Sequence, residues 1–266
     1  MRQWPRPTSE GAKMNLKPGI AWIIGGGSGI GAAVARELAG RGWQVAISGR
    51  RVERLEEVSA SHPGIHAYPL DITDAEAVAA TVAAIAADFG RIDLLLYGAV
   101  AATGTPPGSY DAARFAAAFD VNVMGLVRLL DPVIAQMSRQ PAGGQIAVIS
   151  SLAGYVGLPR GGAYAATKSA LITLCQTMRV ELEPRRIIVR LITPGFVKSE
   201  LTARNRYRMP LLMETEDAAW RIVDGLVRST RFEIAFPWPM VFVMKAARLL
   251  PYRLFFWLSA LTLRAR

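Results

Sequence analysis

The sequence predicts an α/β protein built on a doubly wound, seven-stranded parallel sheet with helices on both faces. Two observations support this fold class: short aliphatic runs alternate with alanine-rich helical stretches, and the runs are apolar throughout. With 266 residues, 52% of them hydrophobic and 20% charged, the chain has the composition of a globular protein. We expect a flexible segment at residues 1–16, one domain at 17–236 and a helical tail at 237–266.

Seven short runs are expected to be strands because they are aliphatic and rich in β-branched side chains. They lie at residues 21–24, 44–48, 66–70, 93–97, 145–150, 187–193 and 233–236. Helices are expected at residues 29–40, 52–61, 74–89, 110–137, 163–182 and 216–229. The segment 196–215 falls outside this alternation and follows the sixth strand, so it is a candidate lid over a bound ligand.

The net charge of +10 comes from 31 basic and 21 acidic residues, and part of the excess lies at the carboxyl terminus. Residues 239–266 contain no acid, and their basic residues are Lys245, Arg248, Arg253, Arg264 and Arg266. These residues alternate with Leu, Phe, Trp and Met, and the chain has no zinc-finger or RNA-binding motif, which argues against a nucleic-acid partner. An anionic lipid surface or a hydrophobic partner fits the pattern better.

The tail is expected to form two short amphipathic helices separated by Pro251. One apolar stripe would contain Met240, Met244, Ala247 and Leu250, opposite Lys245, Arg248 and Tyr252, and a second would contain Leu254, Trp257, Leu258 and Leu261. Basic residues interrupt the segment, so it should not cross a membrane. An anionic membrane surface, the chain's own ligand cleft and a homo-oligomer interface are equally suitable destinations.

The only cysteine, Cys175, lies in an apolar helical stretch and is expected to be buried without a disulfide. His62 and His66 flank a turn and are expected to be solvated, so no metal site is predicted. No apolar stretch of signal-peptide length precedes the glycines at 25–27, so a secretory signal peptide is not expected. We expect a cytoplasmic homo-oligomer, a dimer or tetramer, with peripheral contact to the inner face of the membrane as an open alternative.

The first expected strand is followed at once by Gly25-Gly26-Gly27-Ser28-Gly29-Ile30-Gly31 and then by a helix. Glycines at such a junction let the turn close and let the backbone approach a pyrophosphate at the positive end of the helix. A tight turn alone would also explain a glycine run. The position between strand and helix near the start of the chain favours a dinucleotide.

The residues after the second expected strand bear on the choice of cofactor. An acidic residue there would bind the ribose hydroxyls of NAD, but this chain has Ser48-Gly49-Arg50-Arg51. Because a guanidinium pairs with a 2′-phosphate, NADP(H) is favoured over NAD(H) unless both arginines are merely solvated. Asp71, after the third strand, would accept from the adenine amino group or cap its own turn.

A tyrosine and a lysine are spaced for acid–base chemistry in the helix expected at 163–182. Tyr164 and Lys168 are four residues apart, so they share one helix face. A free tyrosine has a pKa of about 10, and a nearby cation favours its phenolate. The pair alone is a weak signal, but Ser150-Ser151 ends a strand just upstream and adds a hydroxyl donor.

Taken in order, the glycine loop, the strand-end serine and the Tyr/Lys pair resemble the short-chain dehydrogenase/reductase family, whose members are single-domain Rossmann enzymes. The resemblance extends over residues 17–236. It implies four catalytic residues, with Asn122 on a kinked helix holding a water in a proton relay: Asn122, Ser151, Tyr164 and Lys168. The expected cofactor-binding residues, the two arginines included, are Gly25, Gly27, Ser28, Gly29, Ile30, Gly31, Arg50, Arg51, Asp71, Ile72, Gly98, Ala99, Tyr164, Lys168, Pro194, Gly195, Val197 and Ser199.

Two positions depart from the family pattern. Ile24 replaces a threonine before the glycine loop, and Tyr97-Gly98-Ala99-Val100 stands where the family has Asn-Asn-Ala-Gly. In the family, the threonine and the asparagine segment support each other across adjacent strands. Their joint absence predicts a repacked apolar contact here, with Val100 narrowing the floor beneath the nicotinamide.

The resulting prediction is a metal-free, NADPH-preferring enzyme that reversibly reduces a carbonyl, with Tyr164 as general acid and base. The alternatives are an NAD-dependent alcohol dehydrogenase and a non-catalytic dinucleotide-binding module. Residues 152–160 and 196–215 are expected to line the substrate pocket. Both segments contain apolar side chains, so the substrate is expected to be a hydrophobic ketone or aldehyde.

Overall fold

A computed structural model of the chain describes residues 16–101, 108–200, 202–204 and 209–264. Seven parallel strands form one sheet in the order β3-β2-β1-β4-β5-β6-β7. They are β1 (Ile20–Ile24), β2 (Gln44–Ser48), β3 (Ile65–Ala67), β4 (Leu94–Tyr97), β5 (Gly144–Ile149), β6 (Ile187–Pro194) and β7 (Glu233–Phe236). The predicted sheet is confirmed. The order reverses between β1 and β4, and doubly wound sheets bind ligands outside the strand ends at such a point.

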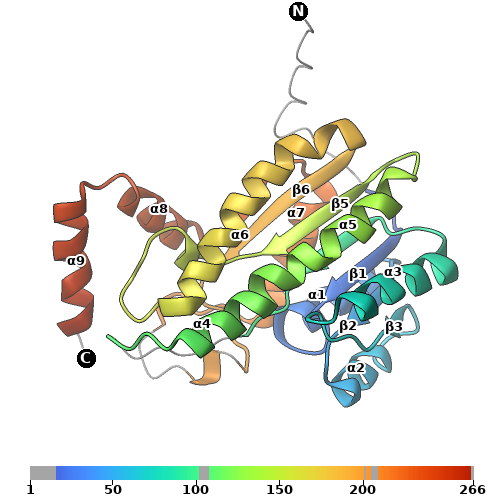
Figure 1. Cartoon of the computed structure of the whole chain (residues 1–266), viewed down its shortest axis with the longest axis horizontal. Helices are drawn as coiled ribbons and strands as arrows, with labels where there is room; N and C mark the ends of the chain where they lie inside the picture. Colours follow the sequence, from blue (N-terminus) through green and yellow to red (C-terminus); the bar gives the residue numbers. More distant parts are fainter. Residues whose placement is uncertain (1–15, 102–107, 201, 205–208, 265–266) are drawn as a thin grey trace, which may run out of the picture.

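Helices cover both faces of the sheet (Figure 1). One face carries α1 (Gly29–Gly40), α2 (Val52–Ser59) and α7 (Thr215–Arg228), and the other carries α3 (Ala75–Phe89), α5 (Gly125–Ser138) and α6 (Gly162–Glu181). In β1, Trp22 and Ile24 pack into one hydrophobic core and Ala21 and Ile23 into the other. A strand buried on both faces reads as an unbroken apolar run, which is the pattern in the sequence.

Two predicted elements need correction. The helix predicted at 110–137 is interrupted: α4 (Ala112–Phe119) leads into a π-helical turn, η1 (Asp120–Met124), before α5 begins. The third strand ends at Ala67, earlier than predicted, although the N–H groups of Tyr68 and Leu70 still donate to the carbonyl oxygens of Ile47 and Gly49 beside it. The predicted segment 1–16 lies, except for Leu16, outside the described residues.

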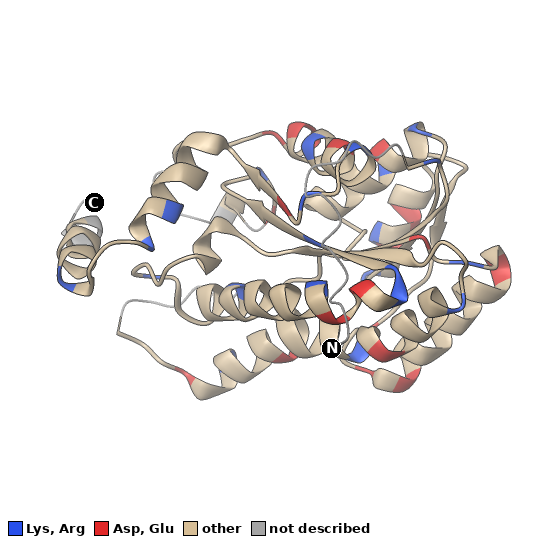
Figure 2. Ribbon diagram, turned by 90° about the horizontal axis from the view of Figure 1, so that it is seen from above, with Lys and Arg blue, Asp and Glu red and all other residues tan. Residues whose placement is uncertain are grey.

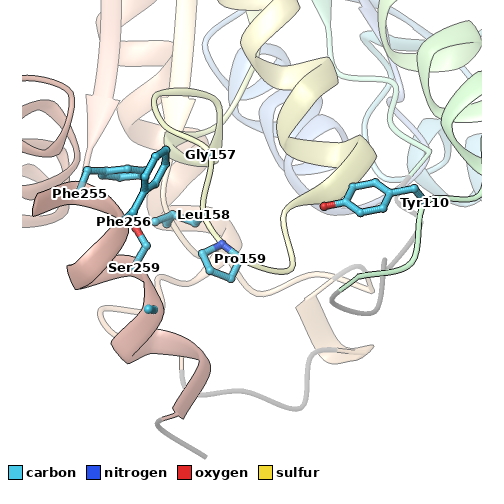
Figure 3. Close-up of a pocket in the computed structure, with 8 residues that line it drawn as sticks. Tyr110, Gly157, Leu158, Pro159, Phe255, Phe256 and Ser259 are labelled. Atoms are coloured by element: carbon cyan, nitrogen blue, oxygen red, sulfur yellow. The ribbon is translucent and has the colours of Figure 1, made fainter. Parts of the chain in front are cut away.

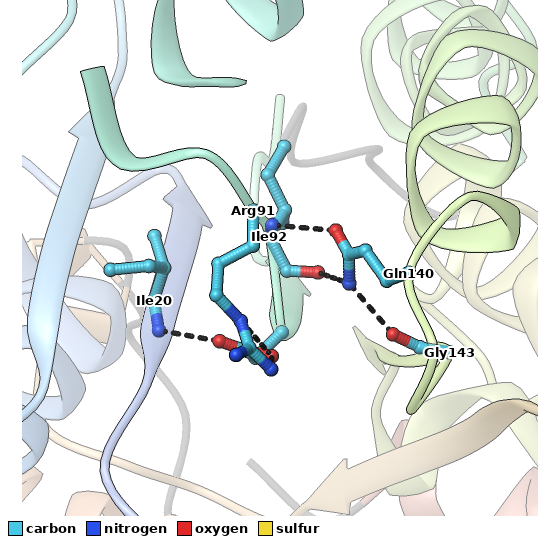
Figure 4. A network of polar contacts seen from close by, with 6 residues as sticks. Ile20, Arg91, Ile92, Gln140 and Gly143 are labelled. Carbon is cyan, nitrogen blue, oxygen red and sulfur yellow. Dashed lines mark hydrogen bonds and ion pairs between the residues drawn. The ribbon is translucent and has the colours of Figure 1, made fainter. Parts of the chain in front are cut away.

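The amino edge of the sheet is closed by side chains (Figure 4). Asp93 accepts a hydrogen bond from the backbone N–H of Ile20 at 2.9 Å and is paired with Arg91. The amide of Gln140 accepts from the N–H of Ile92 at 2.9 Å and donates to its carbonyl oxygen at 3.0 Å. These contacts satisfy backbone groups at the amino edge and leave the carboxyl edge for ligands.

Two helices follow β7, as predicted, and lie at one end of the molecule (Figure 1). They are α8 (Trp238–Ala247) and α9 (Tyr252–Arg264). Met240 and Met244 share a face of α8 that packs against the core, in agreement with the predicted first stripe. Within the part of the chain that the structure describes, no helix is long and apolar enough to span a bilayer.

Candidate active site

The glycine loop after β1 leaves room for a close backbone approach. Gly25 has a φ of +83° and Gly29 a φ of +51°, a region that L side chains rarely adopt. A Cβ on Gly31 would lie 2.2 Å from the carbonyl oxygen of Gly25, so no side chain fits there. A Cβ on Gly29 would meet only Ser199, at 3.5 Å, so the space beside this glycine is open.

The N-terminus of α1 lies directly behind this loop. Ser28 is the N-cap residue, but its side chain makes no hydrogen bond to the helix, and its Oγ accepts one from Arg51 Nη2 at 2.8 Å. The first-turn N–H groups, beginning with Gly29 and Ile30, therefore have no side-chain cap, and the positive helix end suits an anion. The glycine cradle and this uncapped helix fit the pyrophosphate of a dinucleotide.

The two arginines after β2 have different surroundings. Arg51 donates to Ser28 and forms an ion pair with Glu200 at 3.0 Å. Arg50 is exposed and makes no hydrogen bond or ion pair with another described residue. Glu200 belongs to the candidate lid segment 196–215, so this segment reaches Arg51 beside the glycine loop. Of the two, only Arg50 has no hydrogen bond or ion pair with a described residue, although its charge helps to lower the pKa of Asp71.

The connections after β3 and β4 complete this side of the site. Asp71 accepts hydrogen bonds from the backbone N–H of Thr73 at 3.0 Å and from its hydroxyl at 2.8 Å, which holds the pKa of Asp71 below its usual value. The turn-capping alternative for Asp71 is therefore realised. Ile72 is buried, and Gly98 N–H donates to the carbonyl oxygen of Ile24 at 2.9 Å. Ala99 is partly buried against the core.

Tyr164 and Lys168 of α6 and Ser151 after β5 lie at the carboxyl edge of the sheet. Lys168 Nζ lies 5.7 Å from the centre of the Tyr164 ring, one helical turn away on α6. It donates to the carbonyl oxygen of Ile149, the last residue of β5, at 2.8 Å. Ser151 follows two residues later and is buried, and its Oγ accepts from the N–H of Ala153 at 3.1 Å. Lys168 therefore ties α6 to the end of β5, two residues before Ser151.

Burial determines the charge state of Lys168. The side chain is 3% exposed, and desolvation lowers the pKa of Lys168 from 10.5 to about 8. The ammonium is therefore charged at neutral pH and loses its charge in mildly alkaline solution. A positive charge at this place makes it easier for a neighbouring hydroxyl to release its proton.

Asn122 lies in the π-helical turn and is fully buried. Its Oδ1 accepts from the N–H of Ala101 at 2.7 Å, and its Nδ2 donates to the Thr167 hydroxyl at 3.0 Å. The Thr167 hydroxyl in turn donates to the carbonyl oxygen of Tyr164 at 2.8 Å. Asn122 therefore links the segment after β4 to the turn of α6 that carries Tyr164.

Tyr97 corrects one expectation about the departures from the family pattern. Its hydroxyl donates to the carbonyl oxygen of Val121, the residue before Asn122, and a Cβ on Gly125 would lie 2.6 Å from that hydroxyl. Desolvation raises the pKa of Tyr97 above its usual value, so the hydroxyl stays protonated. The contact is therefore polar, not only apolar, and supports the π-helical turn. Val100 is exposed.

We expect Tyr97→Phe to lower the free energy of unfolding by about 1–3 kcal/mol, because it removes a buried donor from the carbonyl of Val121. Chemical denaturation of both proteins measures the difference. Tyr110→Phe is the matched control, since Tyr110 is exposed. An equal loss in both variants would contradict the role of the Tyr97 hydroxyl.

The segment after β6 forms another wall of the site. Gly195 N–H donates to the carbonyl oxygen of Phe236 at 2.8 Å, directly after Pro194. A Cβ on Gly195 would lie 2.9 Å from the sulfur of Met240, so α8 packs closely against this turn. Val197 pairs with Met213, and the N–H of Ser199 donates to the hydroxyl of Thr202 at 2.9 Å. Residues 201 and 205–208 of the candidate lid lie outside the described residues.

Sequence reasoning missed a second polar cluster beside the site. The Tyr155 hydroxyl is hydrogen-bonded to Thr193 at 3.0 Å and donates to Glu233, and Glu233 pairs with Lys245 of α8 at 2.5 Å. The partner of Ser150 was not predicted either: its hydroxyl donates to the carbonyl oxygen of Lys168 at 2.8 Å. No sequence motif marks these residues, because the partners are as many as 78 positions apart.

An open hollow of about 430 Å³ lies between α9 and the loop before α6 (Figure 3). Its lining offers both polar and apolar surface and consists of Tyr110, Gly157, Leu158, Pro159, Phe255, Phe256, Ser259 and Ala260. Loop 157–159 belongs to the segment that was expected to line the substrate pocket. The tail helix α9 forms the opposite wall.

The histidines and the cysteine are outside this chemistry. His62 Nδ1 accepts from the N–H of Gly64 at 3.0 Å, and His66 Nε2 contacts the side-chain oxygen of Gln44 at 2.8 Å. Among the described residues, no group of three or more His, Cys, Asp or Glu is placed to hold a metal ion. Cys175 is buried, as predicted.

Comparison with known proteins gives matches over most of the chain. Residues 19–209 match the family model described as short chain dehydrogenase. An uncharacterized oxidoreductase of Myxococcus xanthus is 37% identical over 88% of this chain and 94% of its own length. Farnesol dehydrogenase of Aedes aegypti is 30% identical over 81% of this chain and 92% of its own length.

A solved structure agrees with the architecture. A short-chain dehydrogenase from Streptomyces avermitilis superposes with a TM-score of 0.78, covering 86% of this chain and 92% of that one. The two sequences are 24% identical, so this similarity establishes the fold alone.

Proposed function

This chain belongs to the short-chain dehydrogenase/reductase family, and from that premise we propose that it is an NADPH-preferring reductase that converts a ketone or aldehyde into an alcohol. Membership makes it an oxidoreductase of a family that binds NAD(P)H and acts on small molecules, often as oligomers. The observation that carries the finer proposal is the buried Lys168 ammonium beside Tyr164. Lys168 is hydrogen-bonded to the end of β5, two residues before Ser151.

The roles of the side chains follow from their hydrogen bonds. Ser151 Oγ already accepts from Ala153, so its own proton is available for the carbonyl oxygen of the substrate. Tyr164 donates a second hydrogen bond and transfers its proton to that oxygen as the carbon receives a hydride. Lys168 stabilises the charge left on the Tyr164 oxygen, and Asn122 holds the water through which the proton is replaced. When bound, the reduced nicotinamide supplies the hydride.

The cofactor would lie along the glycine loop at the carboxyl edge. Its pyrophosphate would meet the α1 N-terminus, and Asp71, Ile72, Gly98 and Ala99 would flank the adenosine and the central cleft. Pro194, Gly195, Val197 and Ser199 would flank the nicotinamide. Arg50 supports the preference for NADPH, because its guanidinium has no hydrogen bond or ion pair with a described residue and no carboxylate directly follows β2.

An apolar carbonyl compound is the proposed substrate class. The hollow beside α9 is lined by Leu158, Pro159, Phe255 and Phe256, which favour an apolar chain over a charged one. The Aedes relative is named for farnesol, an apolar alcohol. We further propose that residues 17–236 form the catalytic unit of a cytoplasmic homo-oligomer.

Assay of cofactor oxidation with short and long ketones and aldehydes tests the proposal directly. We expect turnover with NADPH, and higher kcat/KM for long apolar carbonyls than for short ones. Cofactor binding without turnover of any compound in the panel would favour a non-catalytic binding module. A higher kcat/KM with NADH would favour the NAD-dependent alternative.

The rate of carbonyl reduction is expected to fall as the pH rises through about 8, because Lys168 then loses its positive charge. The effect on stability has the opposite sign. The pKa of Lys168 is about 8 in the folded protein and 10.5 in the unfolded chain, so the unfolded chain binds this proton more tightly. The contribution of Lys168 to the free energy of unfolding therefore grows as the pH rises from 8 to 10.5. Measured kcat against pH checks the first statement. A flat profile from pH 6 to 10 would contradict it.

Lys168→Met should abolish most turnover and weaken NADPH binding, since it removes the charge and the proposed contact to the nicotinamide ribose. Activity measurements and cofactor titration separate the two effects. Lys17→Met is the control, because Lys17 is exposed and precedes β1, on the amino side of the sheet. Unchanged kcat in Lys168→Met would remove Lys168 from the mechanism.

A further inference from the structure

We propose that α8 and α9 together form a docking surface for an anionic lipid bilayer. The proposal rests on the exposure of their side chains and on their charge, and it does not depend on the catalytic function. We call this surface the tail surface: the exposed residues Trp238, Phe242, Val243, Arg248, Leu249, Tyr252, Arg253, Leu254, Phe256, Trp257, Leu258 and Leu261.

The helix α8 is apolar on two sides. Its inner residues Met240 and Met244 pack against the core of the domain. Its outer residues Trp238, Phe242 and Val243 are 77%, 67% and 62% exposed. A helix that is needed only to cover the sheet would be polar on its outer side, so the outer apolar residues indicate a further contact.

The helix α9 presents even more apolar surface. The predicted second stripe of Leu254, Trp257, Leu258 and Leu261 is present, and each of these side chains is at least 41% exposed. On the neighbouring side, the rings of Tyr252 and Phe256 stack at 5.6 Å. Short helices are marginal in water unless tertiary packing stabilises them, so α9 gains stability if its apolar side is covered.

The charge of the tail surface identifies the occupant. Figure 2 shows Lys and Arg but no Asp or Glu on α8 and α9. Lys245 is paired with Glu233, whereas Arg248 and Arg253 form no ion pair with any described residue. Aromatic and aliphatic side chains that alternate with unpaired arginines match the boundary between acyl chains and anionic headgroups.

A second copy of the chain fits less well. A two-fold contact through the tail surface would bring the arginines of both copies together, and residues 239–266 contain no acid to compensate them. In a bilayer, the same arginines meet lipid phosphates while the apolar side chains enter the hydrocarbon boundary. The helices have 10 and 13 residues, so they would lie on the bilayer and not span it.

Flotation of the full-length protein with lipid vesicles tests the proposal. We expect binding to vesicles of phosphatidylcholine mixed with phosphatidylglycerol, weak binding to phosphatidylcholine alone, and release at high salt. Arg248→Gln with Arg253→Gln should reduce the partition to anionic vesicles roughly thirtyfold, because each basic residue near such a surface contributes about 1 kcal/mol. Phe242→Ser with Trp257→Ser should reduce binding further.

Matched controls lie on α7, where Trp220 and Arg221 are exposed. Trp220→Ser with Arg221→Gln changes the same residue types on another surface and should leave vesicle binding unchanged. Because all substituted side chains are exposed, we expect the variants to keep their folded circular dichroism spectrum. Equal binding to both kinds of vesicle, or no binding, would overturn the proposal. Conversion of an oligomer to a monomer by Phe242→Ser with Trp257→Ser, without vesicle binding by the unsubstituted protein, would assign the tail surface to a second copy.

Discussion

Tyr164→Phe is expected to reduce kcat for carbonyl reduction by about 10²–10⁴-fold while leaving the NADPH dissociation constant nearly unchanged. The phenylalanine ring keeps the packing of α6 but has no proton to give to the substrate oxygen. Lys168 keeps its hydrogen bond to the carbonyl of Ile149, so the carboxyl edge should retain its shape. Steady-state rates and a fluorescence titration with NADPH measure the two quantities.

Tyr68→Phe provides the matched control for this experiment. The Tyr68 hydroxyl donates to Asp88 of α3, away from the site, so its loss should leave kcat unchanged. Turnover by Tyr164→Phe at the rate of the unsubstituted protein would refute the assignment of Tyr164 as the proton donor. A loss of NADPH binding in the same variant would instead indicate a change in structure.

Gly49→Asp combined with Arg50→Ala is expected to reverse the cofactor preference from NADPH to NADH. A carboxylate after β2 accepts hydrogen bonds from ribose hydroxyls and repels a 2′-phosphate, and the loss of Arg50 removes the favourable charge. The aspartate fits, because a Cβ on Gly49 would meet only Leu55 at 3.8 Å. The loss of one charge-assisted hydrogen bond alone should lower kcat/KM for NADPH roughly ten- to hundredfold.

The ratio of kcat/KM for the two cofactors, measured before and after substitution, decides the outcome. Arg36→Ala is the control for charge: Arg36 is an exposed arginine on α1 whose side chain is hydrogen-bonded to Ser61. The ratio should not change in this variant. If the unsubstituted protein already prefers NADH, the argument from Arg50 is wrong, and the engaged Arg51–Glu200 pair becomes the relevant feature of the ribose side.

Most of the fold could be predicted from local patterns in the sequence. The ranges predicted for β2, β7 and α1 agree with the structure at both ends. In each of these elements, the spacing of the apolar residues along the sequence differs from that in the neighbouring segments. In addition, α1 begins within a glycine-rich turn. The parallel arrangement followed from the alternation of strands and helices, because parallel neighbours need crossover connections.

The interruption of the helix predicted at 110–137 could not be predicted in this way. The π-helical turn is held by contacts from other parts of the chain: Tyr97 reaches the carbonyl of Val121, and Asn122 is bonded to Ala101 and Thr167. Thr167 is 45 residues away in sequence. Helical periodicity contains no information about such partners, so the periodicity indicated a continuous helix, and only the family resemblance implied a kink at Asn122.

The sequence by itself determined the fold class, the order of the strands along the chain and the residue types at the candidate site, because spacing and residue chemistry are local properties. Only the tertiary structure decided that Lys168 is buried with a lowered pKa, that Arg51 is engaged while Arg50 is not, and that α9 leaves its apolar stripe exposed. Solvent access and ion pairing depend on which distant segments pack together, and that packing decides the chemistry available to each side chain.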